Sequence, residues 1–163
     1  MEQRVHAAAV GLGSNLGDRR AHIDAAFLGL GALPSTRVLA RSTLIETEPV
    51  GPAGQGLYLN GAALIETALD PRALLAAMLE IERSRGRERC ASQRWGPRTL
   101  DMDLLIFGDR VIDEPGLTVP HPRLHERRFV LEPLAEIAPG LLVPGVGASV
   151  RTLLDRLGPG GGR

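Results

Sequence analysis

Two aspartates, Asp101 and Asp103, stand one residue apart in the apolar segment R-W-G-P-R-T-L-D-M-D-L-L-I-F-G, which runs from Arg94 to Gly108. If this segment forms a strand, side chains at i and i+2 point to the same face, and the two carboxylates lie about 6 to 7 Å apart. Two negative charges this close in an apolar strand repel each other unless a cation or a proton lies between them. Because both donors are oxygens, the pattern favours Mg²⁺ over zinc. A solvated sheet face is the alternative interpretation of D-x-D taken alone.

A cluster of arginines precedes the two aspartates. All 19 basic residues of the chain are arginines, which excludes lysine Schiff-base chemistry and the lysine of a Walker A loop. Six of them fall within sixteen residues, namely Arg83, Arg85, Arg87, Arg89, Arg94 and Arg98. Guanidinium groups bind phosphate oxygens through planar, charge-assisted hydrogen bonds. Metal-holding carboxylates beside such arginines are the parts of a phosphoryl-transfer site, which works by positioning and charge neutralisation.

Composition narrows the class of protein. The 163 residues fit one domain, which we assign to residues 1–158, with residues 159–163 as a flexible tail. The net charge is zero, so the chain has no overall positive charge that would attract nucleic acid. Although 44% of the residues are hydrophobic, no apolar run approaches the roughly 20 residues of a membrane span. The single cysteine, Cys90, excludes an internal disulfide and fits a reducing compartment, and the N-terminus has no signal-peptide pattern, so we expect the protein in the cytoplasm. We expect the protein to act as a monomer on small molecules.

The elements expected from hydrophobic periodicity and from Gly, Pro and cap residues alternate in a recognisable order. The expected strands are Val5–Leu12, Thr36–Thr47, Tyr58–Thr67 and Thr99–Phe107. Helices are expected from the cap Asp18 to Leu33 and from Asp70-Pro71 to about Arg85, with two short ones at Phe129–Ile137 and Ser149–Leu157. A hairpin pairs Arg110–Ile112 with Leu117–Val119 around a turn at 113–116, and residues 49–56 and 86–97 are loops, the second long and mobile. The order predicts an α+β, ferredoxin-like βαββαβ antiparallel sheet with helices on one face.

One motif offers a different interpretation. The segment G-L-G-S-N-L-G follows the first expected strand and precedes a helix, like the turn of a dinucleotide-binding Rossmann fold. No acidic residue ends a second strand about 20 residues later, and two consecutive strands break the βαβαβ order. We therefore interpret these glycines as shaping a turn against the sheet.

Three motifs together carry a specific resemblance. R-W-G-P-R-T-L-D-M-D, Y-L-N at Tyr58 to Asn60, and L-T-V-P-H-P-R at Leu117 to Arg123 occur in this order, between G-L-G-S-N-L-G-D-R and E-P-L-A-E-I-A-P. This set resembles the 6-hydroxymethyl-7,8-dihydropterin pyrophosphokinases, folate-pathway enzymes that transfer pyrophosphate from ATP to a pterin and release AMP. The resemblance covers nearly the whole chain.

The resemblance implies a role for each matching residue. Asp101 and Asp103 would hold two Mg²⁺ ions, and Arg87 and Arg98 would join them as catalytic residues. The nucleotide would contact Arg87, Arg89, Trp95, Arg98, Leu104, Thr118, His121 and Arg127. The pterin ring would stack between Tyr58 and Phe129 beneath Trp95, with its edge read by Asn60 and by backbone at Thr47 and Val50. Glu82 matches a position that the family keeps at the end of a helix, which implies a supporting role.

The sequence departs from the family pattern at several sites: a lid loop one residue longer with Cys90-Ala91 in place of basic residues, Glu48 for a proline, Gly116 for a basic residue and Pro122 for a tyrosine. These departures bear on nucleotide affinity and lid kinetics more than on reaction type.

Two rival classes remain open, a ferredoxin-like RNA-binding module and a D-x-D nucleotide-sugar transferase. The first needs exposed aromatics and a basic face on the central strands, whereas the strand here carries two aspartates. The second leaves Y-L-N and Trp95 unexplained.

Overall fold

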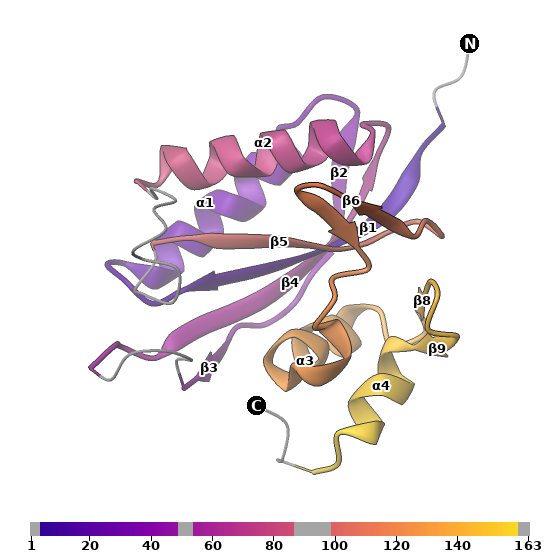
Figure 1. Ribbon diagram of the computed structural model, residues 1–163. Coiled ribbons are helices and arrows are strands. Elements are labelled where there is room, and N and C mark those ends of the chain that lie inside the picture. Colours follow the sequence, from indigo (N-terminus) through magenta and orange to yellow (C-terminus); the bar gives the residue numbers. More distant parts are fainter. Residues whose placement is uncertain (1–3, 49–53, 87–98, 160–163) are drawn as a thin grey trace.

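The computed structural model describes residues 4–48, 54–86 and 99–159. Figure 1 shows a twisted sheet with helices above and below it. In chain order the elements are β1 (His6–Ser14), α1 (Arg19–Gly31), β2 (Thr36–Arg41), β3 (Ile45–Thr47), β4 (Tyr58–Thr67), α2 (Pro71–Ser84), β5 (Asp101–Phe107), β6 (Ile112–Glu114), β7 (Leu117–Val119), the 3₁₀ helix η2 (Leu124–Glu126), α3 (Arg128–Ile137), β8 (Leu142–Val143), β9 (Ala148–Ser149) and α4 (Val150–Arg156). None of the helices described is long and apolar enough to cross a membrane.

The central sheet has the predicted ferredoxin-like order. Its strands lie in the order β2, β4, β1, β5, and β3 pairs with β4 beyond the end of β2. Every pairing in this sheet is antiparallel, which confirms the expected fold class and excludes the parallel sheet of a Rossmann domain. Two small hairpins, β6–β7 and β8–β9, lie outside it.

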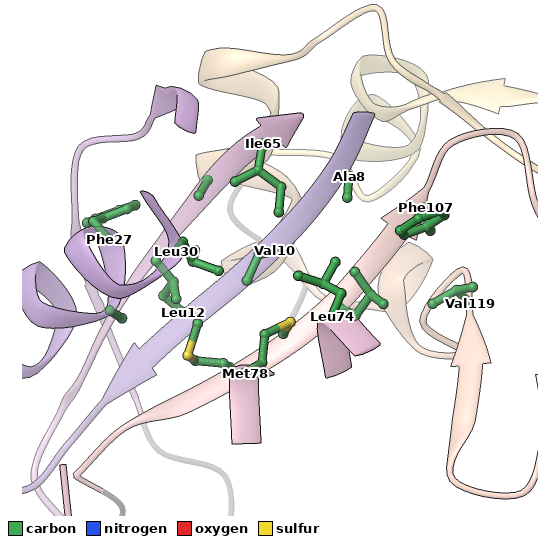
Figure 2. Close-up of a cluster of buried hydrophobic side chains, with 14 of the residues drawn as sticks. Ala8, Val10, Leu12, Phe27, Leu30, Ile65, Leu74, Met78, Phe107 and Val119 are labelled. Atoms are coloured by element: carbon green, nitrogen blue, oxygen red, sulfur yellow. The ribbon is translucent and has the colours of Figure 1, made fainter. Parts of the chain in front are cut away.

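Helices α1 and α2 cover one face of the sheet, and their apolar residues form a core with every second residue of the strands. Val10 and Leu12 of β1 and Met102 of β5 meet Leu30 of α1 and Leu74 of α2 there, all at most 3% exposed. Figure 2 shows most of these side chains converging between the sheet and the two helices. Each fully buried aliphatic side chain of this kind stabilises the fold by about 1.5–3 kcal/mol.

The opposite face of the sheet is also covered, which corrects the expectation of helices on one face only. Leu131 and Leu134 of α3 and Leu153 of α4 form a second core with Leu105 and Ile106 of β5. Figure 1 shows α3 and α4 on the side of the sheet away from α1 and α2. The amphipathic periods at 129–137 and 149–157 predict these helices, but such a period does not say which face of the sheet a helix covers.

Side-chain caps start three of the helices as expected. Asp18 accepts a hydrogen bond from the Ala21 amide at 3.1 Å, Asp70 from the Ala73 amide at 2.9 Å, and Ser149 from the Thr152 amide at 3.1 Å. Each cap satisfies a backbone donor that the first turn leaves without an intrahelical partner, and is worth about 1 kcal/mol.

The expected strand from Thr36 to Thr47 is broken into β2 and β3. Between them the Ser42 amide still donates to the Ala62 carbonyl at 2.9 Å, but the Ala62 amide donates to the Ser42 hydroxyl, at 2.8 Å, instead of to a backbone carbonyl. The Leu44 side chain fills the space over Gly61, where an added Cβ would lie 2.6 Å from its Cδ2. The break therefore depends on a glycine of the partner strand, which the sequence of the broken strand does not reveal.

Two details of the hairpins also differ from expectation. Strand β6 reaches Glu114, so that Glu114 pairs with Leu117 across the two residues Pro115 and Gly116, and Gly116 adopts a φ of +78°. The expected turn at 113–116 was two residues too long. The short β8–β9 hairpin was not expected at all, because each strand has only two residues.

Candidate active site

The two aspartates lie on β5 as the alternation predicts. Met102 and Leu104, at 2% and 5% exposed, face the core under α1 and α2, whereas Asp101 and Asp103 are partly exposed on the other face. This is the same face of the sheet that α3 covers farther along. The carboxylates therefore lie beside α3 rather than beside α1 and α2.

The strand register extends this site across the sheet. Asp101 lies opposite Gly13 of β1, and Gly13 lies opposite Asn60 of β4. Residues directly opposite in an antiparallel sheet point to the same face. The first aspartate and the asparagine of the Y-L-N motif therefore share one face, separated by a glycine. Two motifs that are 40 residues apart in the sequence come together in this way.

Gly13 is required by this arrangement, which sequence reasoning missed. A Cβ at this position would lie 3.0 Å from Asn60 Oδ1 and 3.4 Å from Tyr58 Cδ1, so the Tyr58 and Asn60 side chains lie against bare backbone. The signal was present as V-G-L-G-S, in which glycines alternate with core residues along a strand. Gly13 therefore belongs to strand β1 and not to the expected turn.

The predicted ring-binding residues of β3 and β4 contact each other. Asn60 donates from Nδ2 to Thr47 Oγ1 at 2.6 Å, and Tyr58 pairs with Thr47 in the strand register. Asn60 is 6% exposed, so its amide has a fixed orientation and presents Oδ1 beside Gly13. Val50, the remaining residue predicted here, lies outside the described residues.

An arginine that the sequence did not indicate links Glu46 of β3 to Leu57, the residue just before β4. Arg19 in the first turn of α1 donates from Nη1 to the Leu57 carbonyl at 2.9 Å and from Nη2 to Glu46 Oε1 at 2.8 Å. One guanidinium thus joins the two sides of the segment next to Tyr58 and Thr47. Arg19 belongs to the G-L-G-S-N-L-G-D-R motif, but nothing in that motif names its partners.

The segment that follows β7 brings a histidine to the aspartates. The Val119-Pro120 peptide bond is cis, and the His121 amide donates to the Leu105 carbonyl of β5 at 2.9 Å. Burial and the nearby Arg127 guanidinium lower the pKa of the His121 imidazole, whereas Asp101 acts in the opposite direction. The imidazole is therefore mainly neutral at neutral pH and lies within electrostatic reach of the first aspartate.

Arg127 and Phe129 lie at the start of α3, on the same side of the sheet. The Arg127 guanidinium lies over the Phe129 ring, with Cζ 5.6 Å from the ring centroid, a favourable cation–π geometry. Helix α3 packs against β4, the strand that carries Asn60. The structure thus links Asp101 to Asn60 through Gly13 and, separately, Asp101 to His121, His121 to Arg127 and Arg127 to Phe129.

Two predicted nucleotide residues occupy different surroundings. Thr118 is exposed on β7 and pairs with Asp113, and this hairpin is held to α2 by Arg72, which donates to Glu114 Oε2 and to the Pro115 carbonyl, both at 2.9 Å. The Leu104 side chain is buried in the core under α1 and α2, so only its backbone is left to contact a ligand on the aspartate face.

Glu82 near the end of α2 approaches the aspartates from the other side of the sheet. It is 2% exposed, and its Oε2 accepts a hydrogen bond from the Met102 amide at 2.7 Å. Met102 stands between the two aspartates. The hydrogen bond from the Met102 amide to Glu82 is thus a contact through which Glu82 can support the segment that carries the two aspartates.

The other predicted residues fall in a part of the chain for which no structure is described. Arg87, Arg89, Trp95 and Arg98 lie in residues 87–98, outside the described ranges. The same holds for most of the expected mobile loop. Their roles stay predictions.

The donors on the aspartate face fit a hard divalent cation. Among the described residues, no three His, Cys, Asp or Glu side chains are grouped closely enough to form a metal cage. Mg²⁺ is typically bound by one or two carboxylates, with substrate phosphates and water completing six oxygen ligands. Two neighbouring carboxylates on an accessible face match this pattern, and a soft or tetrahedral metal would need other donors.

Comparison with known proteins gives a consistent result. Residues 9–139 match the family described as 7,8-dihydro-6-hydroxymethylpterin-pyrophosphokinase (HPPK). A 2-amino-4-hydroxy-6-hydroxymethyldihydropteridine pyrophosphokinase of Pseudomonas aeruginosa is 48% identical over 144 residues, which are 88% of this chain and 86% of that protein. One of the same name from Methylorubrum extorquens is 44% identical over 94% of this chain and 95% of its own length.

Solved structures agree on the fold. The wild-type HPPK-DHPS of Plasmodium falciparum with pteroate superimposes with a TM-score of 0.71 at 15% identity, over 96% of this chain and 43% of that longer chain. At this identity the likeness concerns the fold alone. The family match over most of the chain and the close relatives decide the assignment, and the chain belongs to the 7,8-dihydro-6-hydroxymethylpterin-pyrophosphokinase family.

Proposed function

We propose that this protein transfers the pyrophosphoryl group of ATP to the hydroxymethyl oxygen of 6-hydroxymethyl-7,8-dihydropterin and releases AMP, a step of folate biosynthesis. The family and the names of relatives up to 48% identical support this activity. The observation that carries it in the structure is the row from Asp101 through Gly13 to Asn60. In this row the Asp101 carboxylate shares one face with Gly13 and Asn60, and the Tyr58 ring and the Asn60 amide lie against Gly13, which supports a metal site beside a surface for a flat ring.

The pterin binds on the Gly13 surface. A planar heterocycle stacks on the Tyr58 ring on one side and the Phe129 ring on the other. Asn60 reads its polar edge, with the amide held by Thr47. Thr47, Val50 and Trp95 complete the pterin site. A bicyclic ring can contact the backbone closely only where no side chain projects from it. Gly13 provides such a flat surface.

ATP binds with its phosphates between the aspartates and the cations. His121, which interacts electrostatically with both Asp101 and Arg127, and Arg127 itself donate hydrogen bonds to the phosphate oxygens. Arg87, Arg89, Arg98 and Trp95 contribute from residues 87–98, Thr118 contributes from β7, and Leu104 contributes through its backbone. Two Mg²⁺ ions held by Asp101 and Asp103 supply charge neutralisation of the triphosphate.

The reaction is an in-line displacement. The hydroxymethyl oxygen forms a bond to the β-phosphorus, the bond from that phosphorus to the α,β-bridging oxygen breaks, and AMP leaves with the electron pair. The hydroxyl proton passes to solvent. The residues of this chain act by orienting the pterin, by holding the triphosphate and by balancing its charge. We further propose that the protein acts as a monomer in the cytoplasm, without nucleic-acid or membrane partners.

The activity is tested by incubating the protein with ATP, Mg²⁺ and 6-hydroxymethyl-7,8-dihydropterin and then separating the nucleotides. We expect AMP that depends on the pterin, without ADP. ADP in place of AMP would contradict pyrophosphoryl transfer, and absence of turnover would contradict the proposed substrate.

Substitution of the aspartates tests the metal site. Asp101→Ala and Asp103→Ala each leave less than a tenth of the wild-type rate if these carboxylates hold the metals. Asp109→Ala is the matched control, because Asp109 is an exposed aspartate just beyond the end of β5. An Asp103→Ala protein that keeps a tenth or more of the rate would remove the metal assignment.

A further inference from the structure

Glu82 is a buried carboxylate that the proposed reaction leaves without a role. It lies near the end of α2, on the face of the sheet opposite the ligand face, and is 2% exposed. Burial of a carboxylate is unfavourable unless hydrogen bonds to its charged form compensate. Its Oε2 accepts from the backbone amide of Met102 at 2.7 Å, which is the short distance of a charge-assisted bond.

The contact lies at the edge of the sheet. Among the described strands, β5 is the last in the order β2, β4, β1, β5, so β1 pairs with only one side of it. Alternate amides of an edge strand point away from the partner strand and have no ladder partner. The Met102 amide is bound by Glu82, which places it on this outer side. Its neighbours Asp101 and Asp103 then face β1 with their backbone groups.

One peptide segment therefore sets both carboxylates. Met102 is the residue between Asp101 and Asp103, and any rotation of its peptide plane tilts the two side chains relative to each other. The core fixes the Met102 side chain, at 2% exposed, under α2. Glu82 fixes the amide of the same residue. Side chain and backbone of the central residue are thus both anchored to one helix.

We infer that Glu82 is a positioning residue that holds the Asp101–Met102–Asp103 segment in the geometry that binds the divalent cations. The inference rests on the proposed metal role of the two aspartates. Mg²⁺ demands near-ideal octahedral geometry at 2.0–2.1 Å, so small tilts of its carboxylate ligands reduce affinity. Groups that hydrogen-bond to metal-binding segments commonly change metal affinity by 10- to 100-fold when they are replaced.

Two substitutions separate position from charge. Glu82→Gln keeps the length of the side chain and an acceptor oxygen but removes the charge. Glu82→Asp keeps the charge but withdraws it by one methylene, beyond reach of the Met102 amide. The matched control is Glu80→Gln, because Glu80 lies two residues earlier on α2 with 69% of its side chain exposed and pairs with Arg83.

The measurement is the affinity for Mn²⁺, followed by electron paramagnetic resonance of the free ion in the presence of a nonhydrolysable ATP analogue. Titrations are made at 10 °C, with the folded state of each variant verified by circular dichroism. Exchange of the Met102 amide hydrogen is measured on the same samples, because it reports the anchor directly.

We expect Glu82→Asp to raise the Mn²⁺ dissociation constant about 10- to 100-fold and to accelerate exchange of the Met102 amide. Glu82→Gln should stay within about threefold of the wild type, and Glu80→Gln should not differ from it. A loss of affinity in Glu82→Gln without a loss in Glu82→Asp would overturn the inference in favour of a purely electrostatic effect. Faster amide exchange in Glu82→Asp with unchanged Mn²⁺ affinity would also overturn it.

A further variant separates this inference from the proposed function. Asp103→Ala should abolish tight Mn²⁺ binding. If Asp103→Ala binds Mn²⁺ like the wild type, the proposed metal site is wrong. If Asp103→Ala loses binding while Glu82→Asp keeps it, the metal site stands and the role of Glu82 is refuted.

Discussion

Gly13 and Asn60 lie opposite each other on β1 and β4, and a Cβ on Gly13 would come within 3.0 Å of Asn60 Oδ1. The asparagine amide also donates to Thr47 Oγ1 at 2.6 Å, so it cannot move away from Gly13 without losing that bond. The contact makes β1 a part of the proposed pterin surface, although Gly13 has no side chain to contribute.

This relationship predicts the effect of Gly13→Ala. The added methyl group displaces the Asn60 amide by a few tenths of an ångström and tilts the Tyr58 ring, so we expect the KM for the pterin to rise about tenfold with little change in the KM for ATP. Steady-state kinetics with each substrate varied measure both values. Gly11→Ala is the control, because its Cβ meets the Leu105 side chain at an ordinary 3.4 Å. Equal effects of the two substitutions would contradict the prediction.

Arg19→Ala tests the link between α1 and the segment that leads into β4. Loss of the bonds to the Leu57 carbonyl and to Glu46 frees the backbone beside Tyr58. The ion pair itself is exposed and contributes little, so the effect comes mainly from the bond to the carbonyl. We expect a three- to tenfold rise in the KM for the pterin and an unchanged kcat. Arg20→Ala, at the exposed neighbouring position, should leave both values unaltered.

The lowered pKa of His121 predicts a loss of stability in mild acid. Burial and Arg127 hold the pKa of its imidazole below the value of about 6.5 that it has in the unfolded chain. Above pH 6.5 both states are neutral and His121 has no effect. As the pH falls below 6.5 the unfolded chain takes up the proton first, so the folded state loses stability until the pH passes the folded pKa.

Urea unfolding at pH 8, 7, 6 and 5.5 checks this prediction for the wild type and for His121→Asn. The free energy of unfolding of the wild type should fall more steeply below pH 6.5 than that of the variant. Parallel curves for the two proteins would show that His121 does not contribute to the pH dependence.

Glu136→Ala tests the tie between α3 and the break that follows β2. Glu136 accepts bonds from the Thr43 amide at 3.1 and 3.2 Å and from its hydroxyl at 2.7 Å. We expect a loss of about 1 kcal/mol in the free energy of unfolding, since these bonds are exposed, and unchanged kinetic constants. Glu132→Ala, at an exposed site on the same helix, should change the free energy by less than about 0.5 kcal/mol. A changed kcat in Glu136→Ala would mean that α3 moves during turnover.

Local chemistry accounts for the parts of the fold that the sequence predicts. Asp18 and Asp70 begin helices where expected because an N-cap needs only its own helix. The alternation of Asp101 and Asp103 with core residues likewise needs only one strand. The break between β2 and β3 was missed because it depends on Gly61 of another strand.

The same distinction applies to the site. The strand spacing indicated the two aspartates and the resemblance indicated Tyr58, Asn60 and His121, but neither showed how these residues meet. Their meeting depends on strand register, which sets Asp101 opposite Gly13 and Gly13 opposite Asn60. Register arises from the packing of whole faces, so Gly13 and Arg19 became recognisable only with the fold.

The irregularity in β5 restricts how the gene for this protein can diverge. Val10 pairs with Leu104 and Ala9 with Ile106, so Leu105 is an extra residue in the strand, and it joins the core under α3 while Leu104 joins the core under α1 and α2. Because Leu105 and Ile106 share one face, the two aspartates and Phe107 each keep their own face, and one more residue inserted between Asp103 and Phe107 would turn either the aspartates or Phe107 to the wrong face. Lineages descended from this gene can therefore exchange amino acids along β5, but insertions of a single codon into this strand should be rare among them.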